Sequence, residues 1–475
     1  MRRTKILATI GPASNKPETI KKMIESGLSA ARFNFSHFVP ERDIPICDMV
    51  KKVREEMGVP LPFILDTKGP EIRTKTLKDG FENGKVFLEQ GKKFTLTTAD
   101  VEGDETRVSI TYENLTKDVK AGNRILIDDG LIELKVLSVE GTEIHCELLN
   151  SGFLGNKKGV NVPDVHVDLP ALTEKDINDI KFGCQYGFDY VAASFIRTAS
   201  DVREIRKVLE ENGGGHIQII SKIESRDGVD NLDEILEATD GIMGARGDLG
   251  VEIPPEEVPA VQKEMIRKCN LAGKLVVTAT QMLESMQVNP RPTRAEANDV
   301  YNAIMDGTDC VMLSGESANG KYPVESVAMM NRIAIQAESK IDYTTQRETY
   351  RNNDKNSSIA LGHAAMAAAD DLDAACIVPI TDSGFMARMV SRSRPKCPVL
   401  AITSNDKAYR QLGLTWGCLP VLVSDSNEGD EKAFDVAAET AMKTGLAKKG
   451  DTIVALAGMP VKSKAKTNTM RIHTV

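Results

Sequence analysis

The feature of this sequence that most restricts its fold is a set of eight short apolar, β-branched runs that alternate with amphipathic stretches. Such alternation is typical of βα units whose parallel strands form one sheet. We predict strands at Lys5–Ile10, Ala30–Phe35, Phe63–Asp66, Tyr190–Ser194, Ile217–Ile223, Gly241–Met243, Leu275–Thr280 and Cys310–Leu313. Eight parallel strands with outer helices indicate an α/β fold of the (β/α)8 TIM-barrel type.

A second domain interrupts the barrel, because the third and fourth strands are separated by far more residues than a crossover connection needs. The segment from Gly80 to His166 contains short alternating runs bounded by glycine and asparagine turns, such as Arg124–Asp128, Ile132–Val139 and Glu143–Leu149. This pattern predicts a small β-barrel. We therefore assign residues 1–69 and 168–343 to a catalytic barrel and residues 70–167 to an inserted lid domain.

A third domain follows the eighth strand. The polar segment Thr344–Ser358 is typical of a linker. After it we predict a helix at Ile359–Asp370 and strands at Ala375–Pro379, Val399–Thr403 and Thr452–Ala457. Residues 344–475 are thus assigned to a C-terminal α/β regulatory domain.

Composition excludes several classes of function. The net charge of -9 and the pI near 5.5 argue against broad binding to nucleic acid or to an anionic membrane, so any phosphate site must be local. No apolar run approaches the ~20 residues of a membrane span, and the apolar stretch after Arg3 stops at Gly11-Pro12, too early for an export signal. The eight cysteines form no Cys-x-x-Cys pair, which favours reduced thiols and a cytoplasmic location.

Polar residues gather at the carboxyl ends of the predicted strands, where barrel enzymes place their active sites. Lys222 and Glu224 lie two residues apart, so both side chains share one face of their strand. Glu224 and Asp248 can supply two hard oxygen ligands for Mg²⁺ (or Mn²⁺), with phosphate and water completing the shell. The alternative is a salt bridge between Lys222 and Glu224 at the barrel rim, which the addition of Asp248 and Arg32 makes less favoured.

Other polar residues at these strand ends have two interpretations. Asn34, Ser36, Asp66 and Thr67 offer oxygen donors without nitrogen or sulfur, which suits a hard cation. The same residue types commonly cap the next helix or turn, and taken alone this is the better interpretation. His37 alone is likewise more often structural than catalytic.

The glycine-rich run Gly244–Gly250 lacks the spacing of a dinucleotide fingerprint or a P-loop. Its glycines would let backbone N–H groups approach a carboxylate or a phosphate closely, while the alternative is a tight turn required by the fold.

Five longer segments resemble the pyruvate kinase family, and the resemblance extends over essentially the whole chain. They are Leu65–Arg73, Ile220–Glu224, Ala245–Glu252, Ala279–Met286 and Met312–Ser317. The resemblance implies transfer of the phosphoryl group of phosphoenolpyruvate to ADP, giving pyruvate and ATP in glycolysis. It also implies dependence on Mg²⁺ and K⁺ and a homotetramer.

The resemblance further implies a role for each candidate residue. Arg32 is expected to contact phosphate, Lys222 to face the transferring group, and Thr280 to orient the proton donor. The residues expected to bind phosphoenolpyruvate are Arg32, Lys222, Gly247, Asp248 and Thr280, and those expected to bind the nucleotide are Asn34, His37, Arg73 and Lys158. Glu224 and Asp248 are expected to bind Mg²⁺. The expected K⁺ ligands are Asn34, Ser36, Asp66 and Thr67. In the family, a glutamate at the position of Glu71 accompanies K⁺ dependence.

Two alternatives remain, and the third domain departs from the family at two loops. The alternatives are another phosphoenolpyruvate- or pyruvate-using barrel, a lyase or mutase, and a catalytically inactive metabolite sensor. One departure is Thr381–Met386, where many members bind a phosphate of fructose 1,6-bisphosphate with hydroxyls, and where Asp382 would repel phosphate. The other is Met459–Asn468, which carries three lysines where the bisphosphate-responsive members are glycine-rich, although a solvated surface turn is an equal alternative. We therefore expect a phosphorylated monosaccharide or nucleoside monophosphate to act as effector.

Overall fold

The eight predicted strands close into one parallel barrel with the neighbour order β1-β16-β15-β14-β13-β12-β3-β2. The computed structural model describes residues 2–343, 345, 356–424, 430–460 and 466–475. The barrel strands are β1 (Lys5–Thr9), β2 (Ala30–Asn34), β3 (Phe63–Asp66), β12 (Tyr190–Ala193), β13 (Gln218–Ile223), β14 (Gly241–Ala245), β15 (Leu275–Ala279) and β16 (Cys310–Leu313). The predicted TIM barrel is confirmed.

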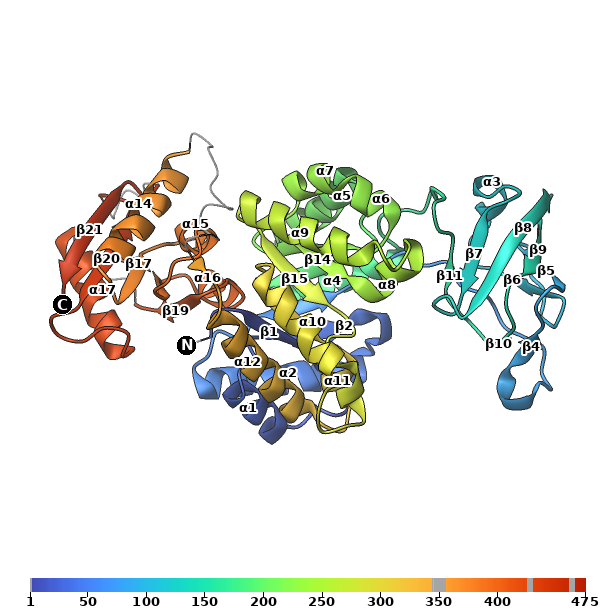
Figure 1. The fold of residues 1–475 in the computed structure, drawn as a ribbon, viewed down its shortest axis with the longest axis horizontal. Coiled ribbons are helices and arrows are strands. Elements are labelled where there is room, and N and C mark those ends of the chain that lie inside the picture. The colour runs from blue at the N-terminus through green and yellow to red at the C-terminus, as the bar shows by residue number, and fades with distance from the viewer. Residues whose placement is uncertain (1, 344, 346–355, 425–429, 461–465) are drawn as a thin grey trace.

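Helices cover the outside of the barrel (Figure 1). They include α1 (Pro17–Glu25), α2 (Pro40–Met57), α4 (Glu174–Tyr186), α5 (Ala199–Glu211), α7 (Leu232–Ala238), α9 (Val258–Ala272), α10 (Arg294–Met305) and α12 (Pro323–Glu338). Successive side chains of a strand point to opposite faces, so the core has two parts, one between the strands and the helices and one inside the barrel. On β1, Ile6 and Ala8 belong to the first and Leu7 to the second. Threonine capping boxes at Thr173, Thr198 and Thr293 begin α4, α5 and α10.

Four predicted strands, Lys5–Ile10, Ala30–Phe35, Tyr190–Ser194 and Leu275–Thr280, end one residue earlier than expected. Two of these ends, after Asn34 and after Ala279, matter for the site. Phe35 belongs to the 3₁₀ helix η1 (Phe35–His37), because the Asn34 side chain accepts a hydrogen bond from the Ser36 backbone and turns the chain. Thr280 leaves β15 with a left-handed backbone, φ 68°. Both residues lie at the carboxyl end of the barrel.

The inserted segment is rich in strands, as predicted. Its strands are β4 (Val86–Leu88), β5 (Lys93–Thr97), β6 (Arg107–Ser109), β7 (Arg124–Ile127), β8 (Ile132–Glu140), β9 (Glu143–Leu148), β10 (Gly152–Leu154) and β11 (Val160–Asn161). They form a six-stranded sheet, β11-β7-β8-β9-β5-β6, and a separate pair, β10-β4, rather than one ring closed by hydrogen bonds. A distinct hydrophobic cluster, from Ile72 to Val162, fills their interior.

The C-terminal residues form a second α/β unit. Its five-stranded sheet has the order β19-β18-β17-β20-β21, in which β21 is antiparallel to β20. The elements are α14 (Ser357–Asp371), β17 (Cys376–Pro379), α15 (Phe385–Arg392), β18 (Val399–Thr403), α16 (Asp406–Leu412), β19 (Cys418–Leu422), α17 (Asp430–Lys443), β20 (Thr452–Ala457) and β21 (Thr469–Thr474). The predicted linker lies largely outside the described residues.

The two added units flank the barrel on opposite sides (Figure 1). The C-terminal unit contacts the barrel where the strands begin: the Lys5 ammonium donates to the Cys418 carbonyl at 2.7 Å, and the Tyr190 hydroxyl donates to the Gln411 carbonyl at 2.8 Å. The inserted strands lie beyond the carboxyl ends of the barrel strands. None of the described helices has the length and apolar character needed to cross a membrane.

Candidate active site

Lys222 lies near the end of β13 and is surrounded by three oxygen atoms. Its ammonium donates to Ser194 Oγ at 2.7 Å and to Asp66 Oδ1 at 3.2 Å, and it lies 3.0 Å from Glu224 Oε1. Only 8% of the residue is exposed. Burial disfavours the charged ammonium, but the charges of Asp66 and Glu224 outweigh it and hold the pKa of Lys222 above its ordinary value.

Arg32 adds a second cation to the same cluster. Its Nε donates to Asp66 Oδ2 at 2.6 Å, and its Nη1 donates to Thr9 Oγ1 at 2.7 Å. Asp66 therefore lies between Arg32 and Lys222. Although burial opposes ionisation, these two cations lower the pKa of Asp66 below its ordinary value, so its carboxylate is charged.

Glu224 is a buried carboxyl group whose charged form is disfavoured by its surroundings. Its Oε2 accepts a hydrogen bond from the Phe195 backbone N–H at 2.6 Å, in a turn where Phe195 has a left-handed φ of 55°. Burial, with a smaller contribution from Asp248, raises the pKa of Glu224 to about 7 although Lys222 lies beside it. A divalent cation would stabilise the charged carboxylate, and one or two carboxylates are the usual protein contribution to a Mg²⁺ shell. The donor set therefore fits Mg²⁺ or Mn²⁺.

The four proposed K⁺ ligands come from neighbouring strand ends. Asn34 and Asp66 are direct partners in the β2–β3 register, and Ser36 and Thr67 follow them in the chain. Their oxygen donors include one ionised carboxylate, a composition that suits a hard monovalent cation. Part of the capping interpretation also holds, because Asn34 caps η1.

Thr280 lies against the start of helix α8 (Arg246–Glu252). Its Oγ1 accepts a hydrogen bond from the Gly247 backbone N–H at 2.7 Å and donates to the Ala279 carbonyl at 2.6 Å. Arg246 fixes this corner, since it donates to the Thr280 carbonyl at 2.6 Å and pairs with Asp299 at 2.7 Å. The glycine-rich run thus forms the end of β14 and the first turn of α8.

A cleft of about 700 Å³ separates the barrel end from the inserted strands, and Asp248, Arg73 and Lys158 all line it. Both cations are held by acidic neighbours: Arg73 Nε donates to Glu71 at 2.7 Å, and Lys158 Nζ donates to Asp128 at 2.8 Å. The structure thus brings these two predicted nucleotide contacts to the cleft that Asp248 faces. Other predicted site residues do not line this cleft: Asn34, Ser36, His37, Lys222, Glu224 and Thr280.

Sequence reasoning missed Ser194 and Phe195. Ser194 accepts from Lys222 and donates to the Thr67 carbonyl at 2.7 Å, while its own N–H donates to Thr67 Oγ1 at 3.0 Å. It therefore connects Lys222 with a proposed K⁺ ligand. The sequence carries a signal for Ser194, because it ends the predicted strand Tyr190–Ser194, the same position at which the other barrel strands carry their polar site residues.

Comparison with known proteins agrees with this geometry. The family model described as the pyruvate kinase barrel domain matches residues 1–327, and the one described as the pyruvate kinase alpha/beta domain matches residues 359–473. The chain is 49% identical over 477 residues to the pyruvate kinase of Clostridium acetobutylicum, with both chains covered in full. It is 50% identical over 478 residues to that of Sporosarcina psychrophila and 49% identical over 480 residues to that of Geobacillus stearothermophilus, covering 100% of this chain and 81% and 80% of those proteins. The order of barrel, inserted strands and C-terminal α/β unit, the Lys222 cluster and the matches along the whole sequence agree that the chain belongs to the pyruvate kinase family.

Proposed function

We propose that this chain transfers the phosphoryl group of phosphoenolpyruvate to ADP and releases pyruvate and ATP. The observation that supports the proposal most strongly is the position of Lys222, whose buried ammonium lies among Asp66, Ser194 and Glu224. A buried, fully charged ammonium at a barrel's carboxyl end suits a reaction in which anionic charge moves between two substrates.

In the proposed reaction, Arg32 and Lys222 bind the phosphoryl group of phosphoenolpyruvate. The bond between phosphorus and the enol oxygen breaks, and a new bond forms to a β-phosphate oxygen of ADP. The electron pair of the broken bond stays on the enol oxygen, and the Lys222 ammonium stabilises the resulting enolate. A proton delivered to the methylene carbon, oriented by Thr280, then gives pyruvate.

The cations are part of the same proposal. Glu224 and Asp248 would hold Mg²⁺ or Mn²⁺, which when bound neutralises charge on the phosphoryl and enolate oxygens. Asn34, Ser36, Asp66 and Thr67 would hold K⁺ beside Lys222. Arg73 and Lys158 would bind the phosphates of the nucleotide, with Asn34 and His37 as further contacts, and the inserted strands would act as a lid over the cleft.

One coupled assay separates the three possible functions. Pyruvate formation is measured with phosphoenolpyruvate, Mg²⁺ and K⁺, with and without ADP. Pyruvate formed only with ADP, together with an equal amount of ATP, is the expected result. Consumption of phosphoenolpyruvate without ADP would indicate the lyase or mutase, and no turnover under any condition would indicate the metabolite sensor.

The effector site of the C-terminal unit is a second part of the proposal. The loop before α15 exposes Asp382 and turns at Gly384, whose N–H donates to Thr381 Oγ1 at 3.1 Å. An exposed carboxylate at this turn supports weak or absent activation by fructose 1,6-bisphosphate and activation by a phosphorylated monosaccharide or nucleoside monophosphate instead. The test is the phosphoenolpyruvate saturation curve with each compound, and a large leftward shift with micromolar fructose 1,6-bisphosphate would contradict it. The lysine-containing loop at 459–468, predicted to differ as well, lies partly outside the described residues.

Two coarser features complete the proposal. All eight cysteines are free thiols, which supports a reducing, cytoplasmic compartment. The family resemblance supports a homotetramer of the 51.8 kDa chain. Size-exclusion chromatography coupled to light scattering measures the molar mass and tests this.

A further inference from the structure

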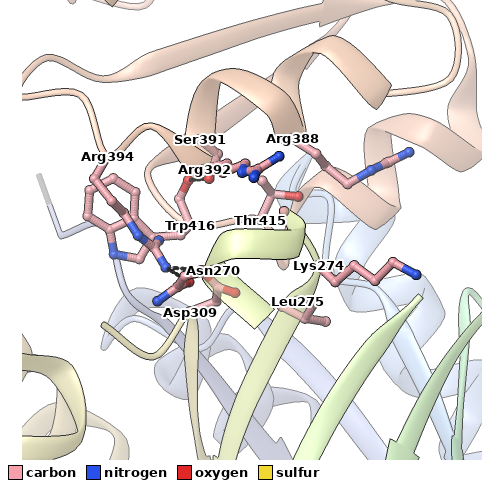
Figure 2. Close-up of a pocket in the computed structure, with 11 residues that line it drawn as sticks. Asn270, Lys274, Leu275, Asp309, Arg388, Ser391, Arg392, Arg394, Thr415 and Trp416 are labelled. Carbon is pink, nitrogen blue, oxygen red and sulfur yellow. Dashed lines mark hydrogen bonds and ion pairs between the residues drawn. The ribbon is translucent and has the colours of Figure 1, made fainter. Parts of the chain in front are cut away.

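A small cavity lies in the seam between the amino-terminal end of the barrel and the C-terminal unit, and Figure 2 shows the side chains around it. Its volume is about 30 Å³. The barrel contributes Asn270, Lys274 and Asp309, and the C-terminal unit contributes Arg388, Arg394 and Trp416. This place is remote from the Lys222 cluster, because it lies where the barrel strands begin.

Arg394 is the most enclosed of these residues, with 2% of its surface exposed. Its Nη2 donates to Asn270 Oδ1 at 2.5 Å and to the Gly307 carbonyl at 2.8 Å, and it forms an ion pair with Asp309 Oδ1 at 2.7 Å. The guanidinium lies 4.5 Å from the centre of the Trp416 ring. Its Nε and Nη1 are buried and find no acceptor among the described residues. Buried N–H donors are rarely left unpaired, so these two atoms point to an acceptor that the protein itself does not supply.

The charges around the cavity indicate what kind of acceptor this is. Lys274 donates only to backbone carbonyls, of Leu236 at 2.5 Å, Glu237 at 3.0 Å and Thr239 at 2.8 Å. Arg388 donates to the Ser383 carbonyl at 3.2 Å. Within the described part of the chain, no carboxylate pairs directly with either side chain. Burial lowers the pKa of both below its ordinary value, although the charge of Asp240 acts on both in the opposite direction.

The carboxylate that lines the cavity does not offset these charges. Asp309 already pairs with Arg394 and accepts a hydrogen bond from the Val276 backbone at 2.8 Å. The cavity lining thus carries four cations, Lys274, Arg388, Arg392 and Arg394, and one carboxylate. A surplus of cations at a largely buried site is unfavourable, and an anion would relieve it, whereas a water molecule would supply an acceptor without a charge.

The size of the cavity selects among anions. A cavity of about 10–15 Å³ is enough to hold one water molecule, so the space suits a particle of about that size, and a halide ion fits this limit. The charged ends of Lys274 and Arg388 point away from Arg394 (Figure 2), so they act on the cavity only through their charge. We propose that the seam binds a single halide ion, chloride in the cell, which accepts hydrogen bonds from Arg394 in a cavity whose lining carries more cations than carboxylates.

Trp416 provides a direct probe, because it is the one tryptophan of the chain and is 3% exposed. Bromide quenches tryptophan fluorescence on contact. The protein is titrated with potassium bromide against potassium gluconate, at constant K⁺ concentration and ionic strength. We expect quenching that saturates and that chloride reverses by competition, since a buried ring is protected from collisions with free bromide. A shallow linear response, unaffected by chloride, would overturn the proposal.

Two variants and a control make the test specific. Arg394→Lys retains the charge but removes the guanidinium donors, so halide should bind at least about tenfold more weakly. If this variant does not fold, Arg388→Gln, at a half-buried position, should weaken binding in the same direction. Arg471→Lys is the control, because Arg471 also lies over an aromatic ring, that of Phe434 at 5.2 Å, but outside the seam. Equal bromide affinity in the wild type and the tested seam variant would refute the assignment.

Crystals grown in bromide give the structural answer. The anomalous difference map should show a peak beside Arg394 that disappears when bromide is replaced with gluconate. Ordered water without anomalous signal at this place would show that the seam holds solvent and would end the proposal.

Discussion

Replacing Lys222 with methionine removes the ammonium that contacts Asp66, Ser194 and Glu224 while keeping a side chain of similar length. Two unit charges about 4 Å apart, at an effective dielectric constant of 20, attract by about 4 kcal/mol. If this attraction to the moving phosphoryl group is realised in the transition state, its loss lowers turnover about 10³-fold. The assay is steady-state pyruvate formation at saturating phosphoenolpyruvate, ADP, Mg²⁺ and K⁺.

The matched control is the same substitution at Lys5. Both lysines are 8% exposed, but Lys5 lies at the opposite end of the barrel, where it contacts the Cys418 carbonyl. Lys5→Met should keep turnover within about threefold of the wild type, because no distortion of the cluster is expected. Turnover of a folded Lys222→Met enzyme within tenfold of the wild type would refute the role given to this ammonium.

Four further outcomes are expected. Ser194→Ala should lower turnover about 10- to 100-fold, because the charged ammonium of Lys222 loses its hydrogen bond to the hydroxyl. Ser194→Thr keeps a hydroxyl and should retain part of the turnover in the same assay. Glu224→Gln should raise the Mg²⁺ concentration for half-maximal activity at least about tenfold, as a titration with Mg²⁺ will show, since an amide is a weaker hard-cation ligand. Glu71→Lys should relax the K⁺ requirement in tetramethylammonium buffer, and full wild-type activity without K⁺ would contradict this prediction. Burial lowers the pKa of Lys5 from 10.5 to about 8. The folded protein therefore carries a buried cation below pH 8, and the free-energy cost of burying this charge is lost as the pH rises from 8 to 10.5. Lys5→Met should be more stable than the wild type by roughly 3 kcal/mol at pH 7 in urea denaturation, and the difference should shrink above pH 8.

Most of the barrel was predictable because its strands are buried on both faces. A continuous apolar run such as Phe63–Asp66 or Cys310–Leu313 needs no partner to be recognised, and these two strands were predicted with their observed bounds. The ends of other strands were less predictable, since the turn after Ala279 depends on the contact of Arg246 with the Thr280 carbonyl. Such a contact joins segments far apart in the chain.

The inserted strands show a different limit. The strands β7, β8 and β9 were predicted well. In β8 and β9 buried residues alternate with more exposed ones, whereas in β7 the three residues after Arg124 are all buried. Whether a set of short strands closes into a ring depends on which edges pair. Here β4 pairs with β10 alone, apart from the six-stranded sheet, and alternation within each strand carries no information on that choice.

The candidate site was predictable as a set of residue types but not as a network. Strand ends placed Lys222, Glu224 and Asp66 at one rim of the barrel, yet the sequence could not show that one lysine contacts two carboxylates and a serine from three other positions. The parallel register decides this arrangement: Ala192 pairs with Asp66 on β3, and Ala193 pairs with Ser221 on β13. Ser194 therefore leaves β12 between the strand that carries Asp66 and the strand that carries Lys222. A shift of this register by one residue would turn the Ser194 side chain to the opposite face and leave the ammonium without its closest acceptor. The carboxylates maintain the charge of Lys222, whereas the position of β12 supplies its closest hydrogen-bond acceptor, and this contribution is visible only once the strands are paired.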